Sequence, residues 1–284
     1  MAEKQTSKTP KSLAKPDLAT IAGLILALGG ILGGLMLEGG KLRDVSQVTA
    51  AMIVLGGTLG AVMVTTPTDV LTRAARRLPS LFLDRAQDID GIIEEIIGYA
   101  SKARREGIVS LEAEADAAPD RFLRKALGLA VDGTDPSQIR EMMELEIGLV
   151  EHHEQAEAKV YEAAGGYAPT IGIIGAVLGL IQVMKNLANI DEVGRGIAVA
   201  FVATVYGVGS ANLFFLPAGN KLKARTQQGI QSQELMLEGV IGIVEGLNPK
   251  LLRIKLDAYQ MHKRAKPAKA AKETAKPEAA PVEI

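Results

Sequence analysis

The chain has 284 residues, of which 48% are hydrophobic and 23% charged, and its formal net charge is -1. It contains no cysteine, which excludes a disulfide framework and a thiolate metal site. Long charge-free stretches alternate with charge-dense ones instead of mixing at helical or strand period, so the pattern argues against an ordinary soluble domain and indicates a membrane protein.

Four charge-free stretches are each long enough to cross a membrane. They cover residues 18–37, 48–66, 163–184 and 196–220. About 20 apolar residues cross a hydrocarbon core of ~30 Å, so each stretch predicts a transmembrane helix. The first stretch follows a lysine-bearing tail, but its apolar run exceeds that of a secretion signal and no convincing cleavage site follows it.

Lysine and arginine near the span ends set the expected orientation. They gather in the amino-terminal tail, after the second span and after the fourth, which places both termini and the large loop in the cytoplasm. The predicted fold class is all-α, a polytopic membrane protein with four transmembrane helices and a helical cytoplasmic domain. The predicted parts are a cytoplasmic tail (1–17), spans one and two with a short periplasmic loop (18–66), a cytoplasmic helical domain (67–162), spans three and four with a short periplasmic loop (163–220), a cytoplasmic helical segment (221–262) and a disordered tail (263–284).

Two helices are predicted in the cytoplasmic domain. Isoleucines between Asp88 and Arg105 recur at helical spacing, and Gly107 is a natural helix stop. Asp135 followed by Pro136 fits a capping residue with a first-turn proline, at the start of a helix that runs straight into the third span. Such a helix is either a lever that passes movement to the membrane or a plain structural stalk.

Small residues recur four positions apart in all four spans. This spacing lets membrane helices approach closely. We prefer helix packing to a phosphate-cradling role, because no strand pattern precedes any of these pairs. The pairs are Gly29 with Gly33, Gly30 with Gly34, Gly56 with Gly60, Gly175 with Gly179, and Ala203 with Gly207.

Two prolines lie near the same end of spans three and four. Pro169 and Pro217 each remove a helical hydrogen bond, which frees the carbonyl groups of Gly165 and Leu213. Two weakened helices at one depth predict a hinge or a ring of exposed carbonyls. The alternative is a tolerated kink buried against neighbouring helices.

The spans contain few polar groups and no acidic or basic side chain. Thr204 lies thirteen residues before Pro217, about 20 Å deeper, and its hydroxyl either serves an ion path or bonds back to the carbonyl one turn earlier. Ion paths usually need an ionisable group or a dense set of oxygens, and no Asp, Glu, Lys, Arg or His occurs inside any span. If this chain conducts ions, a partner must supply the carboxylate.

Five motifs carry a family resemblance. They are LEGG at 37–40, VLGG at 54–57, ASKARREGIVSLE at 100–112, APTIGIIGAVLGL at 168–180 and TVYG at 204–207. With these motifs, residues 17–260 resemble the flagellar motor stator family of MotA, within the wider MotA/TolQ/ExbB group.

The resemblance implies a stator subunit that converts ion-motive force into torque in the bacterial inner membrane. It implies a ring of five copies around a dimer of the single-span partner MotB, whose membrane Asp carries the ion. Neither enzyme activity, a cofactor, a metal nor a nucleic-acid partner is expected. The implied ion-path positions are Pro169, Ala176, Thr204, Tyr206 and Pro217. The implied charges that face the rotor switch protein FliG are Arg104, Arg105 and Glu112.

One position bears on the choice of ion. The residue matching Ala176 is a Thr in sodium-driven members and commonly an Ala in proton-driven ones. A missing hydroxyl leaves one fewer oxygen for a dehydrating sodium ion, so we expect proton coupling. The opening DLAT at 17–20 resembles sodium-driven members, which keeps a sodium-driven stator as an alternative.

Two further alternatives remain at this stage. An ExbB or TolQ protein energises outer-membrane processes with a similar channel, but has three spans with the large loop after the first. The order here is two spans, a loop and two spans, which favours a stator. A passive membrane scaffold that conducts no ion is the other alternative.

Overall fold

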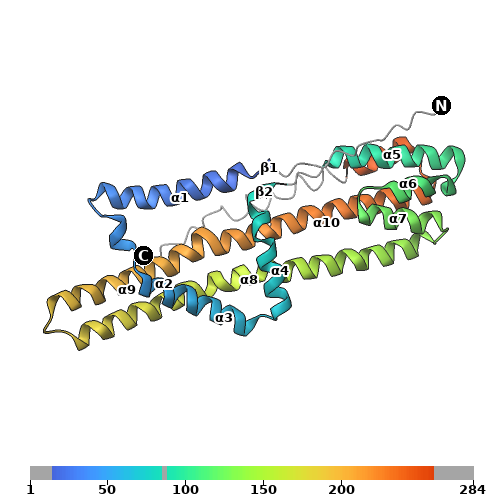
Figure 1. Cartoon of the computed structure of the whole chain (residues 1–284). Helices are drawn as coiled ribbons and strands as arrows, with labels where there is room; N and C mark the ends of the chain where they lie inside the picture. Colours follow the sequence, from blue (N-terminus) through green and yellow to red (C-terminus); the bar gives the residue numbers. More distant parts are fainter. Residues whose placement is uncertain (1–14, 85–87, 259–284) are drawn as a thin grey trace, which may run out of the picture. The chain divides into compact units, whose positions relative to one another are not determined.

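The computed structural model describes residues 15–84 and 88–258, and these are almost entirely helical, which confirms the all-α fold class (Figure 1). The predicted tail at 263–284 and most of the tail at 1–17 lie outside the described residues. In chain order the elements are β1 (Lys15–Pro16), α1 (Leu18–Leu37), η1 (Leu42–Val45), α2 (Val48–Ala51), η2 (Met52–Gly56), α3 (Gly57–Thr65), α4 (Thr68–Arg77), η3 (Leu78–Phe82), β2 (Leu83–Asp84), α5 (Ile89–Glu106), η4 (Ile108–Leu111), α6 (Glu112–Ala117), α7 (Arg121–Val131), α8 (Pro136–Lys185), α9 (Ile190–Ser210), η5 (Ala211–Phe215) and α10 (Leu216–Val244), followed by a helix at 249–258.

Four helices are long and apolar enough to cross a membrane, which confirms the four predicted spans. They are Leu18–Leu37, Leu42–Thr65, Pro136–Lys185 and Ile190–Val244. The third is one uninterrupted helix of 50 residues, so the helix that starts at Pro136 does run straight into span three. The chain is therefore a multi-pass membrane protein.

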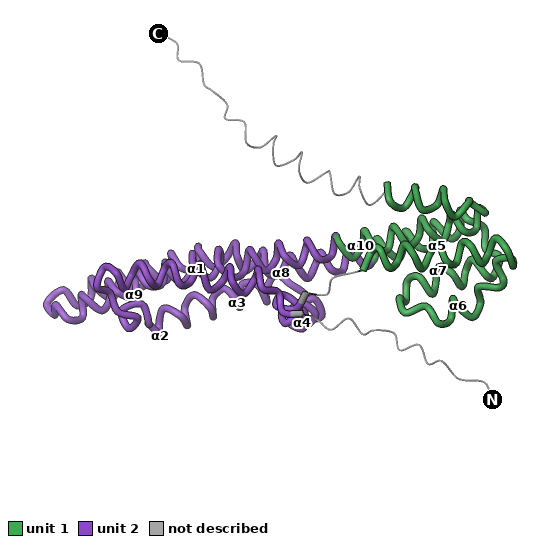
Figure 2. Tube along the Cα trace, turned by 90° about the horizontal axis from the view of Figure 1, so that it is seen from above, with its two compact units in different colours: residues 1–10, 87–149, 228–284 green, residues 11–86, 150–227 purple. Residues whose placement is uncertain are grey.

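The described residues form two compact units (Figure 2). Unit 1 comprises residues 88–149 and 228–258, and unit 2 comprises 15–84 and 150–227. Part of the predicted cytoplasmic domain at 67–162 thus belongs with the spans, because α4 packs on α8 and α10. That contact is a buried cluster of Ala74, Leu81, Ala158, Tyr161, Ala218 and Leu222.

Unit 1 begins with the predicted amphipathic helix. The carboxylate of Asp88 caps α5 by accepting from the N–H of Gly91 at 2.9 Å, and Gly107 ends the helix with a φ of +86°, a left-handed value that glycine adopts without strain. Ile93 and Ile96 are buried on its inner face. Ile96 packs on α10 at Gly239, where an added methyl group would lie 2.7 Å from the isoleucine side chain.

Unit 2 holds the four spans and one short strand pair. No strand was expected from the sequence, but Lys15 pairs with Asp84 and Pro16 with Leu83 in an antiparallel ladder of two residues each. Such a short pairing leaves no alternating pattern that a sequence could reveal. Span one, α1, contributes no buried residue.

Candidate functional site

Spans three and four pack against each other through their backbones. A methyl group added at Gly207 would lie 2.6 Å from the carbonyl oxygen of Ala168, and one at Gly179 would lie 2.7 Å from that of Gly196. These distances leave no room for a side chain, so α8 and α9 touch directly. We call this contact the small-residue seam, formed by Gly172, Gly175, Gly179, Gly196, Ala200, Ala203 and Gly207.

The small-residue seam confirms close packing for two of the predicted pairs, Gly175 with Gly179 and Ala203 with Gly207. Gly172 and Gly196 also belong to the seam, and Ala176 and Ala200 follow them at the same four-residue spacing. Close packing is not found for the pairs in spans one and two. Within the described part of the chain, an added methyl group would meet no atom within 4 Å at Gly29, Gly30, Gly33, Gly34, Gly56 or Gly60.

The two prolines that are predicted to weaken spans three and four lie in neighbouring turns of α8 and α10. Pro169 is half-buried in α8 and leaves the carbonyl of Gly165 without its helical partner. Gly165 packs against Leu216, because a methyl group added there would lie 2.5 Å from Cδ2 of that leucine. Leu216 directly precedes Pro217, so the structure brings the two weakened turns together.

Span four departs from regular α-helical bonding just before Pro217. The preceding segment, η5, is a π-helix over Ala211–Phe215, and it contains Leu213, whose carbonyl is freed by the proline. Pro217 itself is exposed. A widened turn followed by a proline is the arrangement expected of a hinge.

Thr204 and Ala176 lie along the small-residue seam. Thr204 is exposed, and its hydroxyl donates to the carbonyl of Ala200 at 3.2 Å, so the back-bond to the preceding turn is present. Its Cα would be 3.5 Å from a methyl group added at Gly172. Ala176 follows Gly172 by one turn of α8 and is half-buried. The hydroxyl of Thr204 keeps its capacity to accept a hydrogen bond.

Tyr206 is held by the segment that enters span two. Its hydroxyl donates to the carbonyl of Val45 at 2.5 Å and accepts from the N–H of Gln47 at 3.2 Å. Tyr206 also packs on a buried cluster in which Ala50 and Val54 meet α9. The structure therefore ties Tyr206 to span two and not to the prolines, and only the tertiary fold could reveal these partners.

A partly buried charge cluster lies just outside the predicted spans, between α4 and α8. Arg77 reaches Glu154 at 2.9 Å and Glu157 at 3.1 Å, and only 8% of the Glu157 side chain is exposed. Burial, together with the charge of Glu157, raises the pKa of Tyr161. The hydroxyl of Tyr161 donates to the carbonyl of Ala74 at 2.8 Å.

The predicted rotor-facing charges lie together at one turn of unit 1. Arg104 and Arg105 end α5, and Glu112 begins α6, so their charges suit the two helix dipoles. All three side chains are exposed, and none forms an ion pair within the described residues. We call Arg104, Arg105 and Glu112 the charged turn.

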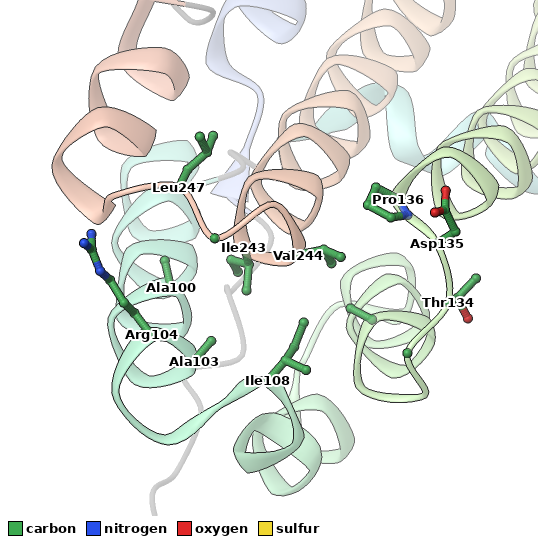
Figure 3. A pocket seen from close by; sticks show the side chains of 13 residues that line it. Ala100, Ala103, Arg104, Ile108, Thr134, Asp135, Pro136, Ile243, Val244 and Leu247 are labelled. Atoms are coloured by element: carbon green, nitrogen blue, oxygen red, sulfur yellow. The ribbon is translucent and has the colours of Figure 1, made fainter.

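A cavity of about 480 Å³ lies beside the charged turn, and Arg104 lines it (Figure 3). Ala100 and Ile108 supply apolar surface, and the start of α8 at Asp135 supplies polar surface. Lys102 of α5 and Glu114 of α6 form an ion pair at 2.5 Å that fixes α6 to α5. The charges are thus presented on a fixed support.

The two sites differ in chemistry, because the spans are neutral and the charged turn is not. The spans provide a neutral seam that carries the hydroxyl of Thr204, and two weakened turns, but no Asp, Glu, Lys, Arg or His occurs inside any span. Among the described residues no group of three or more His, Asp or Glu could hold a metal ion.

Comparison with known proteins gives two family matches. Residues 21–106 match the Motility protein A N-terminal family, and residues 114–234 match the MotA/TolQ/ExbB proton channel family. The chain is 36% identical to Motility protein A of Bacillus subtilis (strain 168) over 244 residues, which cover 86% of this chain and 90% of that protein.

Two solved structures are similar to this chain over most of their length. The structure of C. jejuni MotAB matches with a TM-score of 0.82 and 34% identity, covering 86% of this chain and 95% of that one. The flagellar MotAB stator complex from Bacillus subtilis matches with a TM-score of 0.79 and 36% identity, covering 85% and 95%. The chain therefore belongs to the MotA/TolQ/ExbB proton channel family, in its motility protein A group.

Proposed function

We propose that the chain is a stator subunit of the bacterial flagellar motor, which forms an ion channel with a MotB-type partner and converts ion-motive force into torque. The observation that carries this proposal is the neutral small-residue seam next to two proline-weakened turns. Such helices can shape a path and bend, but an ion-carrying carboxylate has to come from elsewhere. Membership of a family of channel subunits also agrees with the prediction that the chain is not an enzyme.

We further propose the arrangement in the cell. A MotB-type single-span protein supplies the membrane Asp, and five copies of this chain surround a dimer of it. The distribution of Lys and Arg supports cytoplasmic termini and a location in the inner membrane. The relatives with solved structures are described as MotAB complexes, which supports a MotB-type partner.

Co-expression with such a partner tests the proposal. We expect cytoplasmic acidification when the partner carries its membrane Asp and lacks any plugging segment, because each proton that crosses at 100 mV releases about 2.3 kcal/mol. Replacing the partner's Asp by Asn is the matched control and should abolish the acidification. No acidification with the intact partner would favour the passive scaffold.

Proton coupling is proposed from Ala176. We expect motors to keep turning when sodium is withdrawn at constant proton-motive force. In Ala176→Thr, the added hydroxyl supplies one more oxygen beside the seam, and we expect at most a partial sodium dependence of speed. Motors of the unaltered chain that stop without sodium would establish the sodium-driven alternative.

The charged turn is proposed to contact FliG. Exposed, unpaired charges give steering and register without strong adhesion, as a contact that must release repeatedly requires. Arg104→Glu should reduce torque while membrane level and partner binding stay normal. Arg121→Glu is the control, because Arg121 is also exposed but lies at the start of α7. Equal loss of torque in both variants would argue against a specific contact.

The ExbB or TolQ alternative is the weaker of the two channel functions. The structure has spans in the order two, loop and two, and the chain matches Motility protein A of Bacillus subtilis over 90% of that protein. Restoration of swimming in cells that lack their own stator subunit would distinguish the two functions.

A further inference from the structure

Asp17 joins three segments of unit 2 that lie far apart in the sequence. One oxygen of its carboxylate, Oδ1, accepts from the N–H of Thr20 at 3.0 Å and so caps α1. The other, Oδ2, accepts from the ammonium of Lys221 and from the guanidinium of Arg225, the latter at 3.1 Å. The backbone N–H of Asp17 donates to the carbonyl of Phe82 at 2.9 Å. The start of α1, the end of η3 and α10 therefore meet at one residue.

This contact is largely removed from solvent. Only 13% of the Asp17 side chain is exposed, with 25% for Lys221 and 22% for Arg225. Lys221 also donates to the hydroxyl of Thr20, and Arg225 donates to the carbonyl of Leu81 at 3.5 Å. Charge-assisted bonds with several partners have a defined geometry, unlike an isolated surface pair.

The position of the contact relates it to the hinge. Lys221 and Arg225 follow Pro217 by four and eight residues, which is about one and two helical turns on the same face of α10. A hollow of about 280 Å³ lies beside this face, lined by Pro217 and Leu213 on one side and by Gly23 and other residues of α1 on the other. The hinge thus borders open space and is fastened immediately beyond it.

The contact at Asp17 adds side-chain bonds to the attachment of span one, next to the strand pair of Lys15–Pro16 with Leu83–Asp84. No residue of α1 is buried, and its small-residue faces at Gly29 and Gly33 are open within the described part of the chain. The tie at Asp17 fixes the end of α1 that lies next to the hinge. A helix held at one end and open along its length can follow the movement of the element that holds it.

We propose that Asp17 is a positioning residue for ion-driven movement, because its carboxylate fixes the part of α10 that follows Pro217 to the start of α1 and so provides the pivot for bending at Pro217. The inference rests on the proposed function as a stator subunit. Asp17 lies outside the ion-path and rotor-facing sets, and the resemblance at 17–20 gave it no role. The pivot acts through packing and charge, and Asp17 itself does not carry the ion.

The test measures rotation of single motors at low load, where the conformational cycle limits the speed, and counts recruited units from the speed steps. We expect Asp17→Asn to lower the speed per unit about fivefold, which corresponds to about 1 kcal/mol in an activation barrier. Asp17→Glu should keep the speed within about twofold of the unaltered chain, because a carboxylate remains within reach of both cations. Membrane level and the number of recruited units should stay normal.

Two further variants separate positioning from general stability. Asp69→Asn removes a carboxylate from an exposed pair with Arg73, in which 64% of the Asp69 side chain is exposed, and should leave the speed per unit unchanged. Lys221→Met combined with Asp17→Asn should be no slower than Asp17→Asn alone, because both changes break the same contact.

The proposal is overturned if Asp17→Asn lowers only the membrane level or the number of recruited units, with a normal speed per unit. Independent, multiplicative effects of Asp17→Asn and Lys221→Met would overturn it too. In either case motors of the unaltered chain rotate normally. Failure of the proposed function would instead abolish ion-driven rotation in the unaltered chain.

Discussion

The small-residue seam in unit 2 and the charged turn in unit 1 are built in opposite ways. In the seam, neutral backbones touch, with Gly207 placed where a methyl group would lie 2.6 Å from a carbonyl oxygen. In the charged turn, Arg104 and Glu112 are exposed and have no ion-pair partner within the described residues. Close neutral packing fixes how the two backbones approach each other, whereas charges without an ion-pair partner leave a surface accessible to another molecule.

The largest effect is expected from a variant that disrupts the partly buried charge cluster between α4 and α8 in unit 2. Arg77→Met leaves Glu157 with only the guanidinium Nε of Arg73, at 3.3 Å, and should cost about 2–3 kcal/mol, because a charge stays buried with an incomplete partner set. Thermal unfolding of the purified chain in detergent measures this. Lys125→Met in unit 1 is the control, since its pair with Glu146 is exposed and worth about 0.5 kcal/mol. Similar costs for both variants would contradict the contrast between the units.

The second prediction acts on the seam itself. Gly207→Ala places a methyl group against the carbonyl of Ala168, which has to move because it belongs to the backbone, and we expect a cost of about 2 kcal/mol. Gly209→Ala is the matched control on the same helix, because an added methyl group there meets no atom within 4 Å. Melting temperature and membrane level are the measurements. A seam that tolerates Gly207→Ala as well as Gly209→Ala does not depend on backbone contact.

The third prediction separates an anchor from an ion-path residue. Tyr206→Phe removes the hydroxyl that bonds to Val45 and Gln47, and should cost about 1 kcal/mol of stability. If Tyr206 only anchors span two, acidification per assembled complex stays normal in this variant. Lost acidification with an unchanged melting temperature would instead place the hydroxyl in the ion path.

The smallest expected effect concerns pH. Hydrogen bonds from Lys221 and from the N–H of Thr20 lower the pKa of Asp17 from 3.8 to about 2. Because the folded pKa lies below the unfolded one, the carboxylate stabilises the fold above about pH 4, and this contribution is lost as the pH falls towards 2.

The measurement is the difference in melting temperature between the unaltered chain and Asp17→Asn. We expect this difference to be constant from about pH 8 to about pH 5 and to shrink below about pH 4. The amide of Asn cannot titrate, so the melting temperature of the variant shows the pH dependence of the rest of the protein. A difference that already shrinks between about pH 8 and about pH 6 would assign the contact to another titrating group.

Much of the local structure could be predicted from the sequence. Absence of charge over about twenty residues locates a span, since the bilayer excludes charges. The capping carboxylate of Asp88 and the glycine at 107 set the ends of α5, because both act within one turn of their own helix. The start of α8 at Pro136 follows the same logic, with Asp135 accepting from the N–H of Ser137 at 2.9 Å.

The candidate sites were only partly predictable. The positions of the charged turn and the prolines came from motifs, which name residues but not their neighbours. The five small-residue pairs had the same spacing in all four spans, yet only those at Gly175 and Ala203 pack closely in this chain. Spacing shows that a helix can be approached closely, and the tertiary fold decides which helix approaches it.

The sequence by itself determined the four membrane helices, their order and the lack of any charge within them, because these properties depend on whether each segment lies in the bilayer or in water. Tertiary structure alone decided that Tyr206 bonds to Val45, 161 residues away, and that Asp17 bonds to Lys221, 204 residues away. No local sequence pattern identifies such pairs, because each of these residues could equally be a surface residue or a helix cap. Their contact exists only because packed helices bring distant segments within hydrogen-bonding distance.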